Sequence, residues 1–183
     1  MGHRAVFIDR DGTINVNVEY LDDPDNFQMY PGVVEGVKKL TENGFKIIII
    51  TNQSGIARGY FTVETLKKIH ERMLEEFYNK GVTIDAIYYC PHHPDDKCDC
   101  RKPNTLLFEK AIEDFDIDGS KSYVIGDRML DVEAGYRMGL KTILVPENKE
   151  MVRREIEESE IRPDYLCKDF YSGVEKILKN FKS

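Results

Sequence analysis

Residues 5–13, AVFIDRDGT, place a short apolar run directly before two carboxylates and a glycine. Continuous apolar runs of this length are typical of strands buried on both faces of a parallel sheet. Similar runs recur along the chain, and we expect strands at residues 5–8, 46–51, 84–89, 122–125, 142–145 and 165–167. Because ligands bind at the carboxyl ends of such strands, Asp9 and Asp11 stand where a site would form.

Helical patterns separate the expected strands. Apolar residues recur at helical spacing between Pro31 and Asn43-Gly44, which are typical of a helix start and of a C-terminal cap. A longer helix is expected from Thr62 to Gly81, and further helices at residues 104–115, 129–138, 149–159 and 169–180. Strands that alternate with helices predict an α/β fold with a doubly wound, Rossmann-like parallel sheet.

Length and composition limit the class of protein. The 183 residues, 41% of them hydrophobic, suit one compact domain over residues 1–183. The net charge of −7 opposes nonspecific binding to nucleic acid. The apolar run Ile47–Ile50 is far too short for a membrane span, and the N-terminus lacks the apolar run of a signal peptide. We therefore expect a soluble, cytoplasmic monomer without nucleic-acid or membrane partners.

Carboxylates also follow a later expected strand, in Gly126-Asp127 and at Asp131. Four carboxylates gathered at one sheet edge, with Asp9 and Asp11, would repel one another unless a cation lay between them. Mg²⁺ fits best, because it binds a few carboxylates together with phosphate and water. Taken alone, the motif at residues 9–13 could also be a polar turn, since Asp and Gly favour turns.

Two further segments suit phosphate. Residues 51–55, TNQSG, follow the second expected strand and offer a hydroxyl and backbone N–H groups, although an ordinary turn uses the same residues. Arg101 and Lys102 supply positive charge: a lysine suits a phosphoryl oxygen, and an arginine can hold a second phosphate through two hydrogen bonds. The alternative for this pair alone is a solvated surface.

Three of the four cysteines lie within eleven residues, together with a histidine: Cys90, His92, Cys98 and Cys100. This uneven cluster argues against a disulfide framework, and its thiolates and imidazole suit tetrahedral Zn²⁺. Four protein ligands close the coordination sphere, so we expect a structural zinc in a loop over residues 90–100 that aims the following cations. Chance clustering and a redox role are the weaker alternatives. Cys167 is expected to be a small buried apolar residue.

The motifs at 9–13, 51–52, 102 and 126–131 together resemble the four ordered motifs of the haloacid dehalogenase (HAD) superfamily of phosphatases, over about residues 4–146. Within it, residues 15–16, 51–59, 89–94 and 98–103 resemble the heptose-bisphosphate 7-phosphatase family. The resemblance implies the HAD fold and an aspartyl-phosphate intermediate. Neither the interval from Asp9 to Thr51 nor that from Thr51 to Lys102 has room for a cap domain.

The resemblance implies a role for each position. Asp9 would be the nucleophile and an Mg²⁺ ligand, Asp11 the general acid/base and a ligand through its backbone carbonyl, and Asp127 the third ligand. Thr51 and Lys102 would hold the phosphoryl group. Substrate contacts would come from Asn17, Val18, Glu19, Tyr20, Asn52, Gln53, Ser54, Arg101 and Arg128. Asp131 would orient Lys102 or the metal's water shell, and His92, not His93, would bind zinc.

The activity that this resemblance implies is removal of the 7-phosphate of a small sugar, D-glycero-D-manno-heptose 1,7-bisphosphate, during synthesis of nucleotide-heptose precursors of lipopolysaccharide or S-layer. Histidinol-phosphate phosphatases share the four motifs and the zinc loop and are the alternative, although residues 53–59 favour the heptose enzyme. A zinc-stabilised binding module without catalysis is a remote third reading, because the four motif residues of a phosphatase are all present. The preferred anomer stays open.

Overall fold

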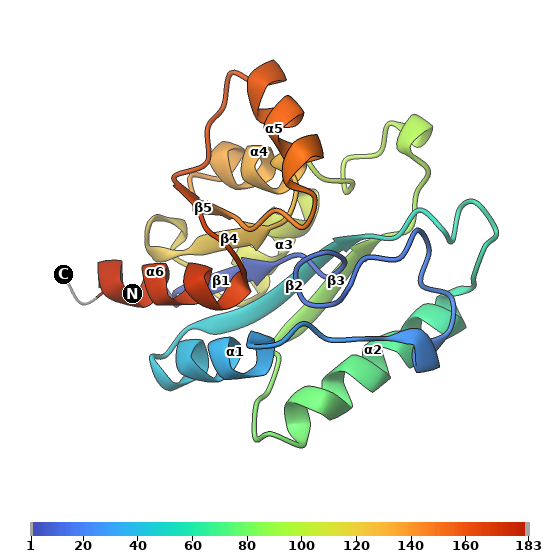
Figure 1. Cartoon of the computed structure of the whole chain (residues 1–183), viewed down its shortest axis with the longest axis horizontal. Coiled ribbons are helices and arrows are strands. Elements are labelled where there is room, and N and C mark those ends of the chain that lie inside the picture. Colours follow the sequence, from blue (N-terminus) through green and yellow to red (C-terminus); the bar gives the residue numbers. More distant parts are fainter. Residues whose placement is uncertain (1, 182–183) are drawn as a thin grey trace.

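A computed structural model describes residues 2–181, so the expected domain extends at its ends over three residues outside the described chain. Six parallel strands form one sheet in the order β3-β2-β1-β4-β5-β6 (Figure 1). The strands are β1 (Ala5–Ile8), β2 (Lys46–Asn52), β3 (Ala86–Cys90), β4 (Tyr123–Gly126), β5 (Lys141–Leu144) and β6 (Tyr165–Leu166). The expected doubly wound α/β sheet is confirmed, with strand limits that shift by one or two residues.

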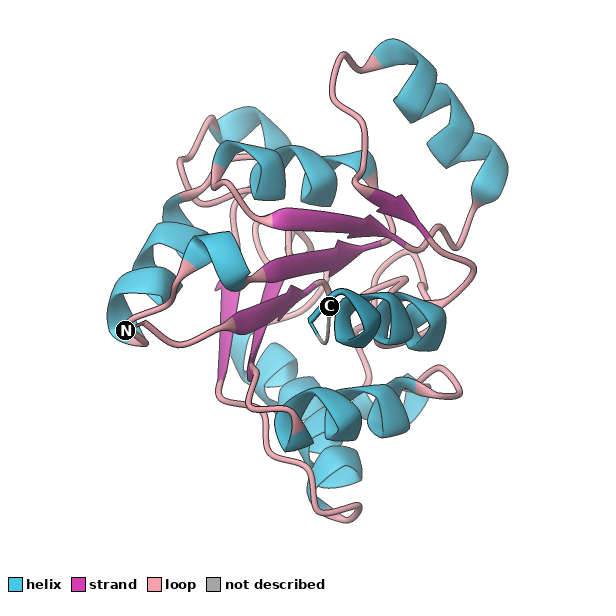
Figure 2. Cartoon of the chain, turned by 90° about the vertical axis from the view of Figure 1, so that its left-hand side faces the viewer, coloured by secondary structure: helices cyan, strands magenta, loops and turns pink. Residues whose placement is uncertain are grey.

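Helices cover both faces of the sheet, as Figures 1 and 2 show. The helices are α1 (Val33–Glu42), α2 (Val63–Tyr78), α3 (Leu106–Asp114), α4 (Met129–Arg137), α5 (Lys149–Glu158) and α6 (Phe170–Phe181), with short 3-10 turns η1 (Pro24–Asn26), η2 (Pro94–Asp96) and η3 (Gly119–Lys121). The sequence pattern does not predict the 3-10 turns. Helix α2, expected to extend to Gly81, ends at Tyr78, because Gly81 takes a positive φ and Val82 N–H donates back to the Phe77 carbonyl.

The two faces of the sheet explain why the central strands are apolar at consecutive positions. Val6 and Ile8 of β1 point into a cluster with α1, α2 and α6, whereas Ala5 and Phe7 point into a second cluster with α3 and α4. Successive side chains of a strand point to opposite faces, so burial on both faces requires every residue to be apolar. The same alternation divides the four isoleucines of β2 between the two clusters.

The strand order positions the candidate site. The chain leaves β1 toward β2 and β3 on one side and later returns to β4 on the other side of β1. In such sheets the crevice forms at the carboxyl ends of the two strands where the order reverses. Asp9 N–H donates to the Ile125 carbonyl at 3.0 Å, so the loops after β1 and β4 begin side by side.

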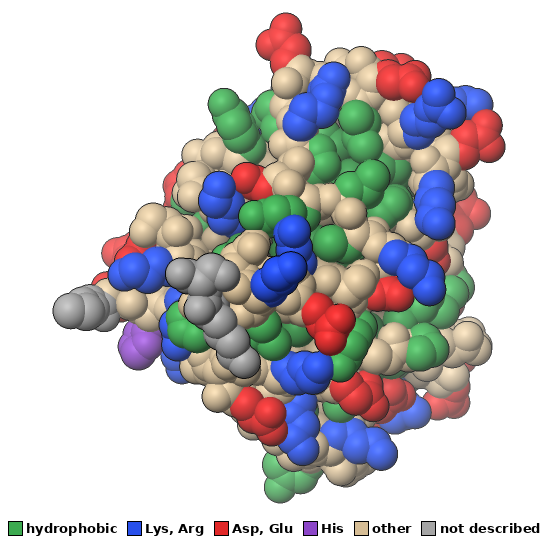
Figure 3. Space-filling model, turned by 60° about the vertical axis from the view of Figure 1, so that its left-hand side comes forward, with side chains coloured by type: hydrophobic (Ala, Val, Ile, Leu, Met, Phe, Trp, Pro, Cys, Tyr) green, Lys and Arg blue, Asp and Glu red, His purple; other side chains and the backbone are tan. Residues whose placement is uncertain are grey.

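The intervals that carry cap domains in related folds are short here. In the described chain, only η1 and α1 lie between β1 and β2, and only α2 lies between β2 and β3. No helix within residues 2–181 is long and apolar enough to cross a membrane. On the face drawn in Figure 3, basic and acidic side chains alternate and do not gather by sign.

Candidate active site and metal cluster

A buried lysine joins the carboxyl ends of three strands. Lys102 is 3% exposed, and its Nζ donates to Asp9 Oδ1 at 2.7 Å, to Asp131 Oδ1 at 2.6 Å and to the Ile50 carbonyl at 2.7 Å. Burial disfavours its charge, but the carboxylates of Asp131 and Asp9 outweigh that effect and hold the pKa of Lys102 above its usual value. The ammonium group is therefore charged and held at a single position.

Asn52, expected to contact substrate, binds the backbone of this lysine. Its Oδ1 accepts from Lys102 N–H at 3.0 Å, and its Nδ2 donates to the Lys102 carbonyl at 3.2 Å. The two bonds tie the end of β2 to the loop that follows β3. Sequence gave no signal for this contact, because the partners are 50 residues apart.

Asp127 is a buried carboxylate with an oxygen that accepts no hydrogen bond from the described residues. The residue is 3% exposed, and its Oδ1 has no hydrogen-bond partner among the described residues. Burial, with the nearby charges of Asp9 and Asp131, raises the pKa of Asp127 to about 9. A Cβ atom on Gly12, whose φ is +80°, would lie 2.3 Å from Asp127 Oδ2, so only glycine lets the β1 loop approach so closely.

Ligand oxygens of Asp9, Asp127 and Asp131 lie within 4.8 Å of one another. Asp131 is already engaged, because Oδ1 accepts from Lys102 and Oδ2 accepts from Arg128 N–H at 3.3 Å. Asp9 and Asp127 are therefore the carboxylates left for a cation. The repulsion between them and the unpartnered oxygen of Asp127 fit a hard divalent cation with oxygen ligands, as Mg²⁺ is.

Asp11 turns toward a separate group of hydrogen-bond donors. Its carboxylate accepts from the guanidinium of Arg10, from Asn15 Nδ2 at 3.0 Å and from Gln53 Nε2 at 2.9 Å. Burial would raise its pKa, but these donors and the charge of Arg10 outweigh burial and hold the pKa of Asp11 below its usual value. Asp11 is thus an ionised carboxylate at the edge of the crevice.

Arg10 and His70 belong to the site although their sequence context predicts no role for them. Asn15, part of a segment that carries the family resemblance, contacts Asp11. Arg10 is 1% exposed and also contacts His70 of α2, with NH1 3.1 Å from Nε2. Burial, with the charge of Arg10, lowers the pKa of His70 to about 3. Arg10 lies inside the first motif, but an arginine beside two aspartates looks like a surface residue, and its burial emerges only when α2 packs over the loop.

Gln53 and Thr51 are buried together beneath the crevice. Gln53 Nε2 donates to Thr51 Oγ1 at 2.8 Å as well as to Asp11, so the amide links the ends of β1 and β2. Gln53, expected to contact substrate, is only 4% exposed and holds site residues in place. Ser54 begins the next turn, in which its carbonyl accepts from Arg58 N–H.

Arginines flank the crevice in two different states. Arg101 has a buried NH1 with no hydrogen-bond partner among the described residues, so it retains a donor for an anion. Arg128, expected to contact substrate, pairs with Glu155 of α5 through Nε at 2.6 Å and through NH2. Its guanidinium therefore already has a carboxylate partner.

The expected substrate loop, residues 17–20, forms an exposed rim. The backbone N–H of Asn17 donates to Glu147, which also accepts from Tyr30 OH. Val18 is 40% exposed, and the ring of Tyr20 meets that of Tyr60 with centroids 4.5 Å apart. Glu19, Tyr20, Asp22 and Tyr60 line an open cleft, so carboxylates and aromatic rings are its main surfaces.

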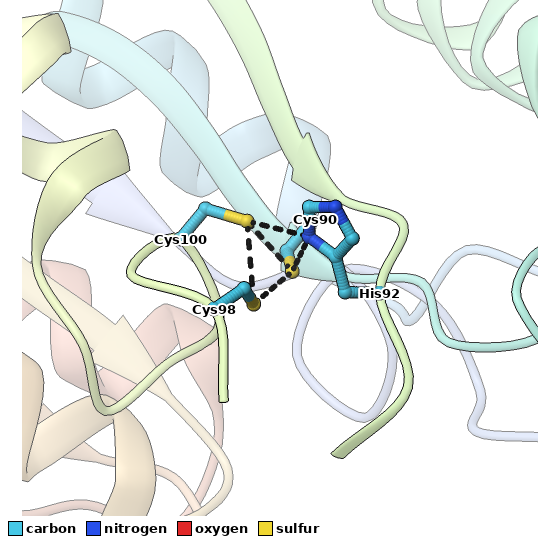
Figure 4. A group of neighbouring side chains, drawn as sticks. All are labelled: Cys90, His92, Cys98 and Cys100. Carbon is cyan, nitrogen blue, oxygen red and sulfur yellow. Dashed lines mark hydrogen bonds between the residues drawn. The ribbon is translucent and has the colours of Figure 1, made fainter. Parts of the chain in front are cut away.

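The four expected metal ligands of the zinc loop converge in Figure 4. The Sγ atom of Cys90 lies 2.9 Å from that of Cys100 and 3.5 Å from that of Cys98, and His92 Nδ1 lies 3.1 Å from Cys100 Sγ. Tetrahedral zinc–sulfur bonds of about 2.3 Å place sulfur atoms roughly 3.8 Å apart, so the cluster has the size of a metal site.

His93 and Cys167 are not part of this cluster. His93 Nδ1 accepts from Asp95 N–H at 3.2 Å and caps η2, so its ring stabilises the turn in the loop. Cys167, expected to be buried, is half-buried at the end of β6. The group of sulfur and nitrogen donors that could hold a metal ion therefore consists of Cys90, His92, Cys98 and Cys100.

Comparisons with known proteins agree with this geometry. A family model described as HAD-hydrolase-like matches residues 99–172. The D-glycero-beta-D-manno-heptose-1,7-bisphosphate 7-phosphatase of Haemophilus ducreyi is 45% identical over 151 residues, covering 78% of this chain and 82% of the relative. The protein of the same name from Yersinia pestis is 39% identical and covers 97% of both chains.

A solved structure extends the likeness to the fold. The D,D-heptose 1,7-bisphosphate phosphatase of B. bronchiseptica, complexed with magnesium and phosphate, superposes with a TM-score of 0.87 at 30% identity. The match covers 97% of this chain and 99% of that one. With identity sustained over nearly the whole length and the strand-end carboxylates in place, the chain belongs to the D-glycero-D-manno-heptose-1,7-bisphosphate 7-phosphatase family of HAD-like hydrolases.

Proposed function

We propose that this protein hydrolyses the 7-phosphate ester of D-glycero-D-manno-heptose 1,7-bisphosphate through an aspartyl phosphate on Asp9. The observation that carries the proposal is the position of Asp9, which lies 2.7 Å from the buried ammonium of Lys102 and beside the unpartnered oxygen of Asp127. A carboxylate so placed can attack phosphorus while fixed charges stabilise the phosphoryl oxygens. The names of the relatives supply the sugar.

Mg²⁺ is the proposed cation of this site. Asp9 and Asp127 would hold it through carboxylate oxygens, and Asp11 through its backbone carbonyl, with hard oxygen donors throughout. When bound, the ion would offset the charge of the phosphoryl group and of its carboxylate ligands. Magnesium in the structure of the B. bronchiseptica relative supports this assignment.

The first chemical step follows from the side chains of the crevice. A carboxylate oxygen of Asp9 bonds to phosphorus as the bond from phosphorus to the sugar oxygen breaks, and protonated Asp11 gives its proton to that oxygen. Lys102 and the hydroxyl of Thr51 stabilise the transferring oxygens. Since Asp131 and Asp9 both bind Lys102, its ammonium is in place before the substrate arrives.

The second step restores the enzyme. Asp11, now a carboxylate, takes a proton from water as the water oxygen bonds to phosphorus. The bond between phosphorus and Asp9 then breaks, which frees phosphate and leaves Asp11 protonated for another cycle. The donors around Asp11 favour its ionised form, which is the form that acts as the base.

Recognition of the sugar is assigned to groups with free hydrogen-bonding capacity. Arg101, with its unpartnered NH1, would bind the rest of the bisphosphate, and the rim at residues 17–20 would face the hydroxyls. Asn52 and Gln53 would support the site from below, since both amides bind protein groups. Short loops and no cap leave the site open to a small substrate.

Zn²⁺ is the proposed occupant of the Cys90, His92, Cys98 and Cys100 cluster. Three thiolates and an imidazole match its preferred ligands, and four protein ligands leave no open position for catalysis. We further propose that residues 1–183 form one domain that acts as a cytoplasmic monomer in nucleotide-heptose synthesis.

The test compares phosphate release by the wild type and by Asp9→Asn in buffer with defined magnesium. We expect Asp9→Asn to retain the fold and lose nearly all turnover, because an amide is a poor nucleophile toward phosphorus. Asp25→Asn, at an exposed aspartate of η1, is the matched control and should act like the wild type. Both anomers of the heptose bisphosphate and histidinol phosphate serve as substrates. Preference for histidinol phosphate, or an active Asp9→Asn, would refute the proposal.

A further inference from the structure

Arg10 is a buried cation beside the proposed acid/base. Its side chain is 1% exposed, and three of its hydrogen bonds go to the carboxylate of Asp11: from Nε at 3.2 Å, and from NH2 at 3.0 and 2.8 Å. A buried charge is tolerated only when it is paired and its donors are satisfied. The remaining donor nitrogen, NH1, meets His70 of α2 at 3.1 Å.

The contact between Arg10 and His70 determines which nitrogen of His70 carries the proton. A guanidinium carries donors and no acceptor, so Nε2 of His70 must accept the hydrogen bond and the imidazole is neutral, with its proton on Nδ1. The ring also packs against Tyr89 of β3, with centroids 6.3 Å apart and the planes 64° from parallel. His70 is thus fixed by its helix and by the sheet.

The planar guanidinium of Arg10 couples the position of His70 to that of Asp11. The guanidinium is rigid, so the hydrogen bond that holds NH1 also sets the direction of Nε and NH2 toward Asp11. We propose that His70 is a positioning residue for the proposed acid/base Asp11 and acts through Arg10. This inference rests on the proposed function, because it assumes that Asp11 transfers protons.

The expected effect is partial and depends on the leaving group. Asn15 and Gln53 still bind Asp11 when the hydrogen bond of His70 is lost, so the carboxylate is misplaced and not released. Displacement of a catalytic group by about 1 Å can cost about a hundredfold in rate, so a smaller displacement should cost less. A sugar alkoxide needs a proton to depart, whereas the p-nitrophenolate of p-nitrophenyl phosphate departs without one.

The experiment measures single-turnover phosphoryl transfer to the enzyme with heptose bisphosphate and with p-nitrophenyl phosphate. His70→Phe keeps a ring against Tyr89 and removes the acceptor. We expect it to slow transfer from the sugar phosphate by about tenfold or more and transfer from p-nitrophenyl phosphate by less than about threefold. His70→Gln, which offers an acceptor oxygen, should restore most of the sugar-phosphate rate.

Ile69→Val is the control for disturbance of α2, since Ile69 is buried on the same helix and has no part in the Arg10 contact. It should leave the ratio of the two rates unchanged. An equal loss on both substrates in His70→Phe, or no loss at all, overturns the inference, as does a folded His70→Gln that is as slow as His70→Phe. Failure of the proposed function would differ, because the wild type itself would then leave the heptose bisphosphate intact.

Discussion

Two buried cations of the active site, Lys102 and Arg10, have hydrogen-bond partners in distant parts of the chain. Lys102 reaches carboxylates 93 residues before it and 29 residues after it, and Arg10 reaches a histidine 60 residues along. An unpaired charge in such a place would cost several kcal/mol. The charged state and fixed position of these side chains therefore depend on the folded structure.

His70 should make the stability of the protein depend on pH. Its pKa is about 3 in the folded protein and 6.5 in the unfolded chain, so the unfolded chain alone takes up a proton between these values. The contribution is thus fully present above pH 6.5 and is lost as the pH falls toward 3. Between pH 7 and pH 5 the loss is about 1–2 kcal/mol in the free energy of unfolding.

Urea unfolding at these two pH values tests this prediction. The wild type should lose more stability on acidification than His70→Phe, which has no imidazole at this position. His3→Gln removes an exposed histidine and should retain the pH dependence of the wild type. The prediction is wrong if wild type and His70→Phe lose equal stability.

Among the elements, the loop from β3 to α3 contains the proposed zinc ligands. Residues 93–99 are mostly exposed and contribute nothing to the buried hydrophobic core. Without a core beneath it, the loop needs another source of order, and a bound Zn²⁺ would provide it. Cys100 lies two residues before Lys102, so order in the loop determines where the ammonium lies.

Loss of zinc should therefore lower activity. We expect Cys98→Ser, or removal of zinc by a chelator, to reduce turnover because Lys102 is no longer held beside Asp9. Zinc content from elemental analysis and phosphate release would be measured on the same samples. Cys167→Ser, at a cysteine outside the cluster, should retain both zinc and activity. Full turnover by protein shown to be free of zinc would contradict this prediction.

The contact between α4 and the sheet depends on a glycine. A Cβ atom at Gly135 would lie 2.3 Å from Val124 Cγ1 and 2.9 Å from Thr142 Cγ2. Gly135→Ala should reduce the free energy of unfolding by about 1–3 kcal/mol, although alanine favours helices by about 1 kcal/mol. In Gly173→Ala on α6 the nearest atom is 3.2 Å away, so a smaller loss is expected. Denaturant unfolding measures the free energy of unfolding of the two variants. A larger loss of this free energy in Gly173→Ala than in Gly135→Ala would refute the packing argument.

At the scale of the whole molecule, one sheet is shared by every buried cluster. The hydrophobic clusters on its two faces use alternate residues of the same strands, so neither can lose its strands without the other. We expect the zinc-loaded protein to unfold in a single transition. The chain has ten tyrosines and no tryptophan, so tyrosine fluorescence and far-UV circular dichroism are the two probes. Transitions at different denaturant concentrations would indicate separate folding units.

Much of the fold was predictable because it depends on local patterns. Apolar runs predicted all six strands, and helical spacing predicted the six longer helices to within a few residues. The ends were less accurate: α2 stops three residues early at a glycine turn, and the 3-10 turns have no periodic signal. Strand ends carrying Asp9, Thr51 and Asp127 were visible because polar residues directly follow buried runs.

Residue order alone predicts the alternation of strands and helices, the carboxylates at the strand ends and the spacing of the Cys and His ligands. Each of these is a matter of residue type and distance along the chain. Tertiary structure alone decided that Asn52 and Gln53 support the site, that Glu155 occupies Arg128, and that His70 reaches Asp11 through Arg10. The physical reason is that hydrogen bonds between remote segments are set by packing, and burial decides which polar groups must find partners.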